Sequence, residues 1–358
     1  SLILISGKIL ALVQISILSR VLEVKDFGDF SSYLSWINII SIPLIAGLQP
    51  YIIRNISKRD DENKKNSMLY FWSEKYVFLM FIVSSFISLL VLHYFHTVSW
   101  MVIVFIVSIV LSKGLINRYS SFLYGFGFPL GSSFPLIVIQ PLVFSIFLIS
   151  LNYFYETTLI TALGFLLGSQ IIVLLIYNRL IKKLPLFCSH TDGENNLDRF
   201  FLHSKNMIPL TVLFVITTFQ NELGILYLSF NSASEDLAYF KIAFSLAILS
   251  TFMVQVVNSF IADKVVVLLK GDNFQLEKLF TTTMLISLLF GLVVYITFLL
   301  FGDFMIQLLF GEEYAPSYNY LLILGAGFLT TTSIGSGALI LNLSGNEKLT
   351  LMAFFISF

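Results

Sequence analysis

The stretch "ITTFQNELGILYLSF", Ile216 to Phe230, decides the class of this protein, because it places a carboxylate inside a long apolar run. Glu222 lies near its middle, directly after Gln220 and Asn221. An ionised side chain at the centre of a bilayer costs from ~2.5 kcal/mol upward, so it needs a polar partner, a proton or a water-filled cavity. Glu222 is therefore expected either to bind a neighbouring helix or to face a functional cavity.

The composition indicates a membrane protein. Of the 358 residues, 57% are hydrophobic and only 12% are charged, whereas globular proteins average ~25% charged residues. The formal net charge is zero, so no nucleic-acid partner is expected, and the single cysteine excludes an intramolecular disulfide. We expect an all-α polytopic membrane protein.

The apolar segments predict about eleven transmembrane helices. The last segment contains about half of the ~20 residues that span a bilayer, so we expect a longer full chain with twelve or more helices. Most lysines and arginines fall in alternate loops, with Lys113 and Arg118 assigned to the loop after the fourth segment, which predicts a cytoplasmic N-terminus. The expected segments are residues 1–19, 30–48, 69–92, 98–117, 132–152, 158–178, 207–230, 239–261, 280–301, 319–342 and 349 onward.

An internal repeat predicts two lobes. "DFGDFSSYLS" (Asp26 to Ser35) aligns with "DLAYFKIAFS" (Asp236 to Ser245), 210 residues later. Both copies join an odd-numbered helix to the next even one, so the repeat relates two six-helix bundles about a pseudo-two-fold axis normal to the membrane. We expect an N-terminal lobe at residues 1–178, a cytoplasmic linker at 179–206 and a truncated C-terminal lobe at 207–358.

Three stretches resemble the polysaccharide-repeat flippases, the O-antigen type, of the multidrug/oligosaccharidyl-lipid/polysaccharide (MOP) exporter superfamily. The first, "LSRVLEVKDFGDFSSYLS", begins at Leu18, and the second, "FQNELGILYLSFNSASEDLAYFKIAFSLA", begins at Phe219. The third, "LFGEEYAPSYNYLLILGAGF" from Leu309, is the most specific. Glu222 stands where this family often has Asp.

The resemblance implies a V-shaped transporter of the MOP and MATE type, with two bundles around a polar cavity. Its implied activity is alternating-access transfer of undecaprenyl-pyrophosphate-linked oligosaccharides to the outer leaflet of the bacterial inner membrane, for surface polysaccharide such as the O-antigen of lipopolysaccharide. The expected partners are that lipid-linked oligosaccharide, membrane lipids, and a polysaccharide polymerase with its chain-length machinery. No cofactor and no metal are expected.

A polar stripe on the seventh predicted helix suggests a cavity wall. Thr211, Thr218, Glu222 and Ser229 are spaced by 7, 4 and 7 residues, which places them within about 40° on a helix. A polar stripe on a membrane helix faces protein or water. Glu222 is the candidate for ion or proton coupling, and a structural hydrogen bond is the alternative.

Lys8 is the candidate partner of Glu222. Its counterpart in the repeat is residue 218, one turn from Glu222, so both side chains are expected at similar depth and could pair when the cavity is empty. Snorkelling of Lys8 to the membrane surface is the alternative. Pyrophosphate needs cations, and further candidates are Arg54, Lys75, Arg118 and Lys241, for each of which a solvated loop end is the alternative.

Two other functions compete with the flippase. A cation-coupled multidrug antiporter of the same superfamily would use Glu222 to bind a proton or Na⁺. A membrane glycosyltransferase or O-antigen polymerase is disfavoured, because the expected outer loops are short. The sequence contains no Walker motif, so we expect a transporter that is not an enzyme.

Overall fold

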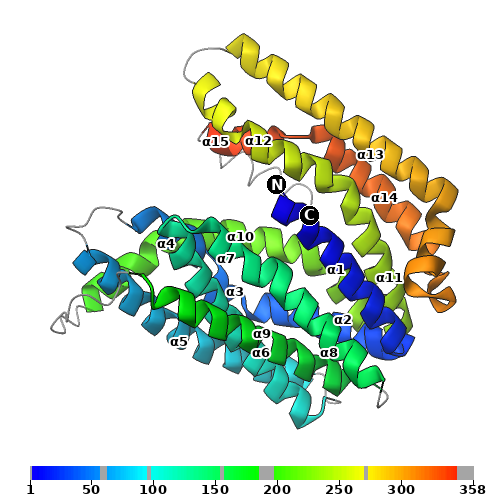
Figure 1. Ribbon diagram of the computed structural model, residues 1–358, viewed down its shortest axis with the longest axis horizontal. Coiled ribbons are helices and arrows are strands. Elements are labelled where there is room, and N and C mark those ends of the chain that lie inside the picture. Colours follow the sequence, from blue (N-terminus) through cyan, green and yellow to red (C-terminus); the bar gives the residue numbers. More distant parts are fainter. Residues whose placement is uncertain are drawn as a thin grey trace. The chain divides into compact units, whose positions relative to one another are not determined.

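The computed structural model describes residues 2–56, 63–94, 98–153, 157–184, 197–269 and 273–344, and all regular structure in these ranges is helical (Figure 1). The helices of the first half are α1 (Leu2–Val21), α2 (Val24–Ile40), α3 (Ile42–Ile45), α4 (Leu48–Asn55), α5 (Asn63–Tyr94), α6 (Trp100–Gly125), α7 (Pro129–Phe134), η2 (Pro135–Ile139), α8 (Gln140–Asn152) and α9 (Leu159–Ile181). Those of the second half are α10 (Leu197–Asn231), α11 (Ser234–Ala247), η3 (Ile248–Thr251), α12 (Phe252–Leu268), α13 (Asn273–Phe310), η4 (Glu312–Tyr314), α14 (Ser317–Ile334) and α15 (Gly337–Leu343).

Six helical segments within the described ranges are long and apolar enough to cross a membrane, and a bent pair, Val24–Ile40 with Ile42–Asn55, gives a seventh. The six are Asn66–Val91, Trp100–Gly125, Pro129–Ser150, Leu159–Ile181, Ser234–Ile261 and Phe274–Phe310. Helices α1, α10 and α14 also form over expected segments. The segment from residue 349 lies outside the described residues, so the count of eleven stays a prediction.

The second span is broken near its middle. Val24–Ile40 and Ile42–Asn55 meet at 46° at Ser41, and a second interruption at Ala46 and Gly47 separates α3 from α4. The stretch from Ser41 to Gly47 is called the break below. Gly47 has φ +72°, and a Cβ there would lie 2.7 Å from the Thr211 hydroxyl oxygen. Glycine adopts this left-handed backbone without strain, so the sequence itself favours the interruption between α3 and α4.

The chain folds as two compact units that divide it differently from the predicted lobes. The amino-terminal unit contains Ile3–Leu22 and Asp29–Phe230, and the carboxy-terminal unit consists mainly of Glu23–Gly28 and the chain from Asn231 onward. Helix α10 therefore belongs with the first unit, although the expected boundary assigned it to the second. Within this unit α10 binds α2 and the break that follows it through the Glu222–Asn38 and Thr211–Ala46 hydrogen bonds.

The offset of the internal repeat recurs in the helix boundaries. Helix α1 ends at Val21 and α10 ends at Asn231, and α2 begins at Val24 while α11 begins at Ser234. Both pairs are 210 residues apart. The break after Ile40 also has a counterpart, because α11 gives way to the η3 turn, Ile248–Thr251.

The three family-like stretches meet at one packing junction in the carboxy-terminal unit. Phe27 packs edge-on against Tyr314 at 5.9 Å, and Tyr239 packs against the same ring at 6.3 Å. Burial raises the pKa of Tyr314, and the neighbouring Glu313 and Tyr239 raise that pKa further. These stretches therefore supply packing residues at helix ends.

Gly28 sits at this junction because no side chain fits there. A Cβ on Gly28 would lie 1.8 Å from the backbone oxygen of Ser234. Gly28→Ala should therefore lower the free energy of unfolding by about 1–3 kcal/mol, the usual cost of overpacking. The measurement is the thermal unfolding midpoint in detergent.

Gly327→Ala is the matched control, because a Cβ there meets nothing within 4 Å and Gly327 lies inside α14. Alanine should be neutral or stabilise this helix by up to about 1 kcal/mol. Equal midpoints for the two variants would contradict the close approach at Gly28.

Candidate functional site

The break in the second span exposes backbone carbonyls, and side chains from three other helices bind them. Tyr76 of α5 donates to the carbonyl of Pro43 at 3.1 Å, and Asn117 of α6 donates to that of Ile45 at 3.3 Å. The hydroxyl of Thr211 on α10 is shared between the carbonyls of Ala46 (3.3 Å) and Met207 (3.0 Å). Irregular backbone at membrane depth is tolerated where protein satisfies it in this way.

A charged relay lies beside this break. The Asn38 side-chain amide on α2 donates to the Glu222 carboxylate on α10 at 2.7 Å. The Lys113 ammonium on α6 donates to the Asn38 side-chain oxygen. All three side chains are half-buried. The relay therefore joins an acid and a base on two helices through one amide on a third.

Asparagine suits the middle position of this relay. An ionised carboxylate only accepts hydrogen bonds and an ammonium only donates them, whereas a side-chain amide does both. The Asn38 amide can therefore satisfy Glu222 and Lys113 together. Opposite formal charges at the two ends compensate each other inside the membrane span.

Lys113 is the functional candidate that sequence reasoning missed. The charge pattern counted it among the cations of a cytoplasmic loop, although it lies inside the expected segment 98–117. Instead α6 continues to Gly125, and Lys113 lies 13 residues after its first residue, Trp100. The signal was available in the apolar residues after Arg118, which extend the span past both cations.

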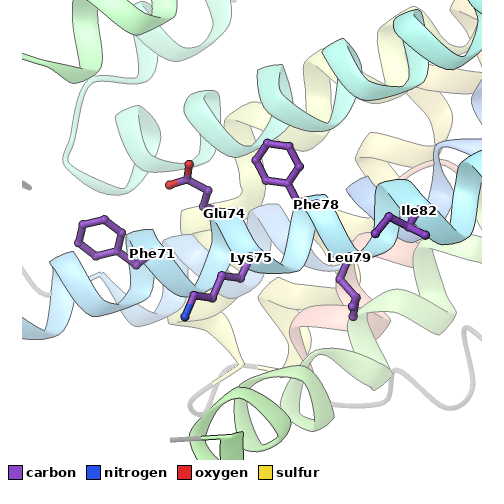
Figure 2. Close-up of a pocket in the computed structure, with 6 residues that line it drawn as sticks. All are labelled: Phe71, Glu74, Lys75, Phe78, Leu79 and Ile82. Carbon is purple, nitrogen blue, oxygen red and sulfur yellow. The ribbon is translucent and has the colours of Figure 1, made fainter. Parts of the chain in front are cut away.

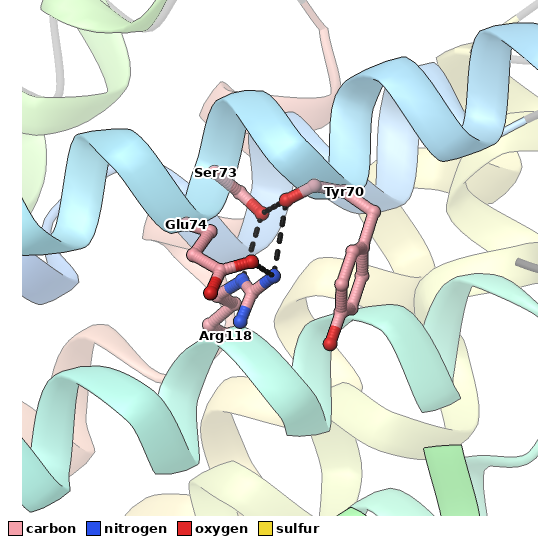
Figure 3. A network of polar contacts seen from close by, with 4 residues as sticks. All are labelled: Tyr70, Ser73, Glu74 and Arg118. Carbon is pink, nitrogen blue, oxygen red and sulfur yellow. Dashed lines mark hydrogen bonds and ion pairs between the residues drawn. The ribbon is translucent and has the colours of Figure 1, made fainter. Parts of the chain in front are cut away.

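Arg118 corrects the expectation of a solvated loop or cavity cation. Its side chain is only 1% exposed, and it joins α6 to α5 (Figure 3). Its Nε donates to the Ser73 hydroxyl at 2.9 Å, and Nη2 reaches the Tyr70 carbonyl at 3.0 Å and the Glu74 carboxylate at 3.3 Å. The guanidinium also lies 4.0 Å from the centre of the Tyr70 ring, so Arg118 acts as a helix clamp.

The remaining candidates do not gather around Glu222. Lys8 is half-buried on α1, and among the described residues the hydrogen bond to Glu222 comes from Asn38 instead. The expected direct Lys8–Glu222 pair is thus not formed in this structure. Arg54 is exposed at the end of α4, Lys75 is exposed on α5, and Lys241 is half-buried on α11 in the carboxy-terminal unit.

Two residues of the polar stripe on α10 bind other helices. Thr211 binds at the α2 break and Glu222 binds Asn38. The Ser229 hydroxyl donates to the Leu226 carbonyl of its own helix, and Thr218 is half-buried between them. Glu222 thus makes the hydrogen bond to a neighbouring helix that was one alternative, and its role in ion or proton coupling stays a prediction.

Comparison with known proteins agrees with this architecture. The family described as "Polysaccharide biosynthesis protein" matches residues 1–267. The chain belongs to this family. The match includes α1 to α11 with the α2 break and the charged relay. No curated protein matches the chain significantly.

A solved structure shares the fold of this family member. It is the inward-facing conformation of a multidrug resistance MATE family transporter of the MOP superfamily. It matches with a TM-score of 0.76 over 97% of this chain and 83% of that chain, at 12% identity. The protein is therefore a multi-pass membrane protein of the polysaccharide biosynthesis family, and its fold is that of a MOP-superfamily transporter.

Arg118→Ala should destabilise the fold strongly, because it removes the α5 clamp and leaves Glu74 without its ion pair. Breaking a buried pair costs ~3–5 kcal/mol, and we expect the lower end because the Glu74 side chain is 43% exposed. The measurement is the folded fraction by size-exclusion chromatography in detergent. Arg54→Ala, at an exposed helix end, should leave that fraction unchanged, and equal losses would contradict the clamp.

The relay predicts energetic coupling between its two ends. Glu222→Gln or Lys113→Gln alone removes one of the two opposite charges that Asn38 links, whereas the double variant removes both charges. The double variant should therefore lose less stability than the sum of the singles, by about 0.5–3 kcal/mol. The unfolding midpoints of the wild type, the two single variants and the double variant measure this coupling. Strictly additive losses of stability would show that the two charges do not interact.

Proposed function

We propose that this protein is a flippase that transfers undecaprenyl-pyrophosphate-linked oligosaccharide repeat units from the cytoplasmic to the outer leaflet. Membership of the polysaccharide biosynthesis family over residues 1–267 is the observation that carries this proposal. The transporter fold supports it, because transfer of a large polar headgroup needs a polar route through the bilayer. We place the protein in the bacterial cytoplasmic membrane with its N-terminus in the cytoplasm.

The broken second span is the proposed moving part of the substrate route. Transporters place binding sites where discontinuous helices expose backbone and half-helix ends. Here the break lies beside Glu222, Asn38 and Lys113. A diphosphate that reaches Lys113 competes with Asn38 for the ammonium, and release of Asn38 frees Glu222 to take up a proton. Binding of substrate and protonation of Glu222 would then favour the same state.

A cation-coupled drug antiporter is the second candidate. The acidic Glu222 on α10 favours it, because a carboxylate in a membrane span can bind a proton or Na⁺. In that case Lys113 would neutralise the carboxylate when no cation is bound.

Deletion of the protein separates the two candidates. A flippase deletion should abolish the surface polysaccharide and leave lipid-linked repeat units on the inner leaflet, as measured by polymer immunoblots and leaflet-specific glycan labelling. Restoration by the intact gene is the control. Unchanged polymer together with raised sensitivity to cationic dyes would instead support the antiporter.

Glu222→Gln should keep near-normal amounts of folded protein but impair polymer export, because the glutamine retains a hydrogen bond to Asn38 and cannot carry charge. Gln220→Leu, on the opposite face of α10, is the matched control and should export normally. Complementation of the deletion with each variant measures export. Normal export by Glu222→Gln would restrict Glu222 to a structural role.

A further inference from the structure

The carboxy-terminal unit buries three serine hydroxyl groups that have no hydrogen-bond partner among the residues that the structure describes. They belong to Ser250 on η3, Ser287 on α13 and Ser336 between α14 and α15. Their side chains are at most 1% exposed. A nearby serine shows a common arrangement, because the Ser333 hydroxyl donates to the Leu329 carbonyl of its own helix at 2.8 Å. A buried hydroxyl without a partner lowers stability, so three of them in one unit indicate a bound ligand.

Ser336 lies where the helix backbone is interrupted. Helix α14 ends one residue before Gly335, and α15 begins directly after Ser336. Gly335 has φ +58°, and a Cβ there would lie 2.9 Å from the Met284 Cα. The last carbonyls of a helix lack α-helical partners and carry its partial negative charge. No basic residue lies in the last turn of α14, so this helix end favours a cation.

Ser287 lies on the face of α13 that packs against this interruption. Met284 of α13 approaches Gly335, and a Cβ on Gly291 would collide with the Thr332 hydroxyl of α14. Positions 284, 287 and 291 are spaced by three and four residues, which places them on one helix face. Ser287 is therefore held between these two contacts, against the end of α14.

The η3 turn brings Ser250 to the same end of α14. Helix α11 runs along α14, with 6.3 Å between the ring centres of Phe240 and Tyr320 and 5.6 Å between those of Phe244 and Phe328. The η3 turn continues this contact with α14, and it also packs against α13 (Figure 1). The three hydroxyls thus lie on three elements that all contact one another.

We propose that this serine cluster, Ser250, Ser287 and Ser336 beside the carboxy-terminal end of α14, binds one monovalent metal cation such as sodium. Hard cations take hydroxyl and carbonyl oxygens as ligands. Secondary transporters coordinate sodium with unwound backbone carbonyls and with the C-terminal ends of broken helices. The cluster contains no carboxylate, and one helix end supplies only about half a negative charge. A single positive charge therefore fits the cluster better than two.

Two features of the amino-terminal unit are separate from this cluster. The groove on α5 (Figure 2) has a volume of about 510 Å³, and four of its six lining residues are exposed and apolar, as on a span that contacts lipid. The relay contains Glu222, the carboxylate that a cation-coupled antiporter would use. All three serines belong to the carboxy-terminal unit instead. The inference does not rest on the proposed function, because ion binding is measured without transport.

Binding of radioactive sodium ions to the purified full chain in detergent tests the proposal, with choline chloride to hold the ionic strength constant. The wild type should bind one sodium ion per chain. Ser287→Ala and Ser336→Ala should each lower the affinity about ten-fold, the loss that follows when a charged ligand loses one polar contact. Ser333→Ala is the matched control and should bind sodium as the wild type does, because its hydroxyl is already bonded within α14.

Thermal unfolding gives a second measurement on the same proteins. In choline chloride, Ser287→Ala removes a buried hydroxyl without a partner and should keep or raise the unfolding midpoint. In sodium chloride, the wild-type midpoint should rise with the ion concentration, because the ion binds only the folded state. The midpoint of Ser287→Ala should rise much less.

Three results would overturn the site. Equal wild-type midpoints in sodium and choline, together with no sodium binding, would assign the hydroxyls to buried water. Equal losses of sodium binding in Ser333→Ala and Ser287→Ala would show that the hydroxyls are not specific ligands. Sodium binding that Glu222→Gln abolishes and Ser287→Ala preserves would place the ion at the relay.

Discussion

Compensation of positive charge inside the span of α6 is the constraint on which the amino-terminal unit depends. Lys113 and Arg118 both lie within this helix, where an unpaired cation would be costly. Arg118 is satisfied by α5 and Lys113 by α2, which in turn binds Glu222 of α10. The two cations thereby tie α6 to α5 and, through Asn38, to α2. This chain of compensation also explains why α10 belongs with the first unit, although the repeat places it at the start of the second half.

Arg118 and Lys113 have different roles because their environments differ. Arg118 is buried and meets a hydroxyl, a carbonyl, a carboxylate and an aromatic face, as a planar guanidinium can. Lys113 is half-buried and donates to the Asn38 side-chain amide, which also binds Glu222. The first arrangement is a clamp in which both Nε and Nη2 have partners on α5. The second arrangement leaves the Lys113 side chain partly accessible, which suits a site that changes hydrogen-bond partners during transport.

The broken span joins this relay to the backbone. Side chains of Tyr76, Asn117 and Thr211 satisfy three carbonyls that the break frees. Three helices thus fix the position of one irregular turn, and Gly47 provides the left-handed backbone that it needs. The family-like stretches do something else. They pack Phe27, Gly28 and Tyr314 at helix ends, which explains why they identify the fold and say little about the substrate.

The sequence by itself determined the class, most helix positions and the repeat. Apolar segments of spanning length are a local property of the chain, and the 210-residue offset recurs at the ends of α1 and α10. It also singled out Glu222, because a carboxylate in an apolar run is conspicuous without any structure. The resemblance predicted the family, which the match over residues 1–267 confirms.

Only the tertiary structure decided the hydrogen-bond and ion-pair partners of the charged side chains. Lys8 was the expected partner of Glu222 on symmetry alone, whereas the contact comes from Asn38, which no charge pattern marks. Lys113 and Arg118 were assigned to a loop, because cations normally end a span. The sequence of one helix shows neither that Arg118 is only 1% exposed nor that it binds α5. Hydrogen-bond partners 184 residues apart depend on which helix faces pack together, and that is a property of the assembled bundle.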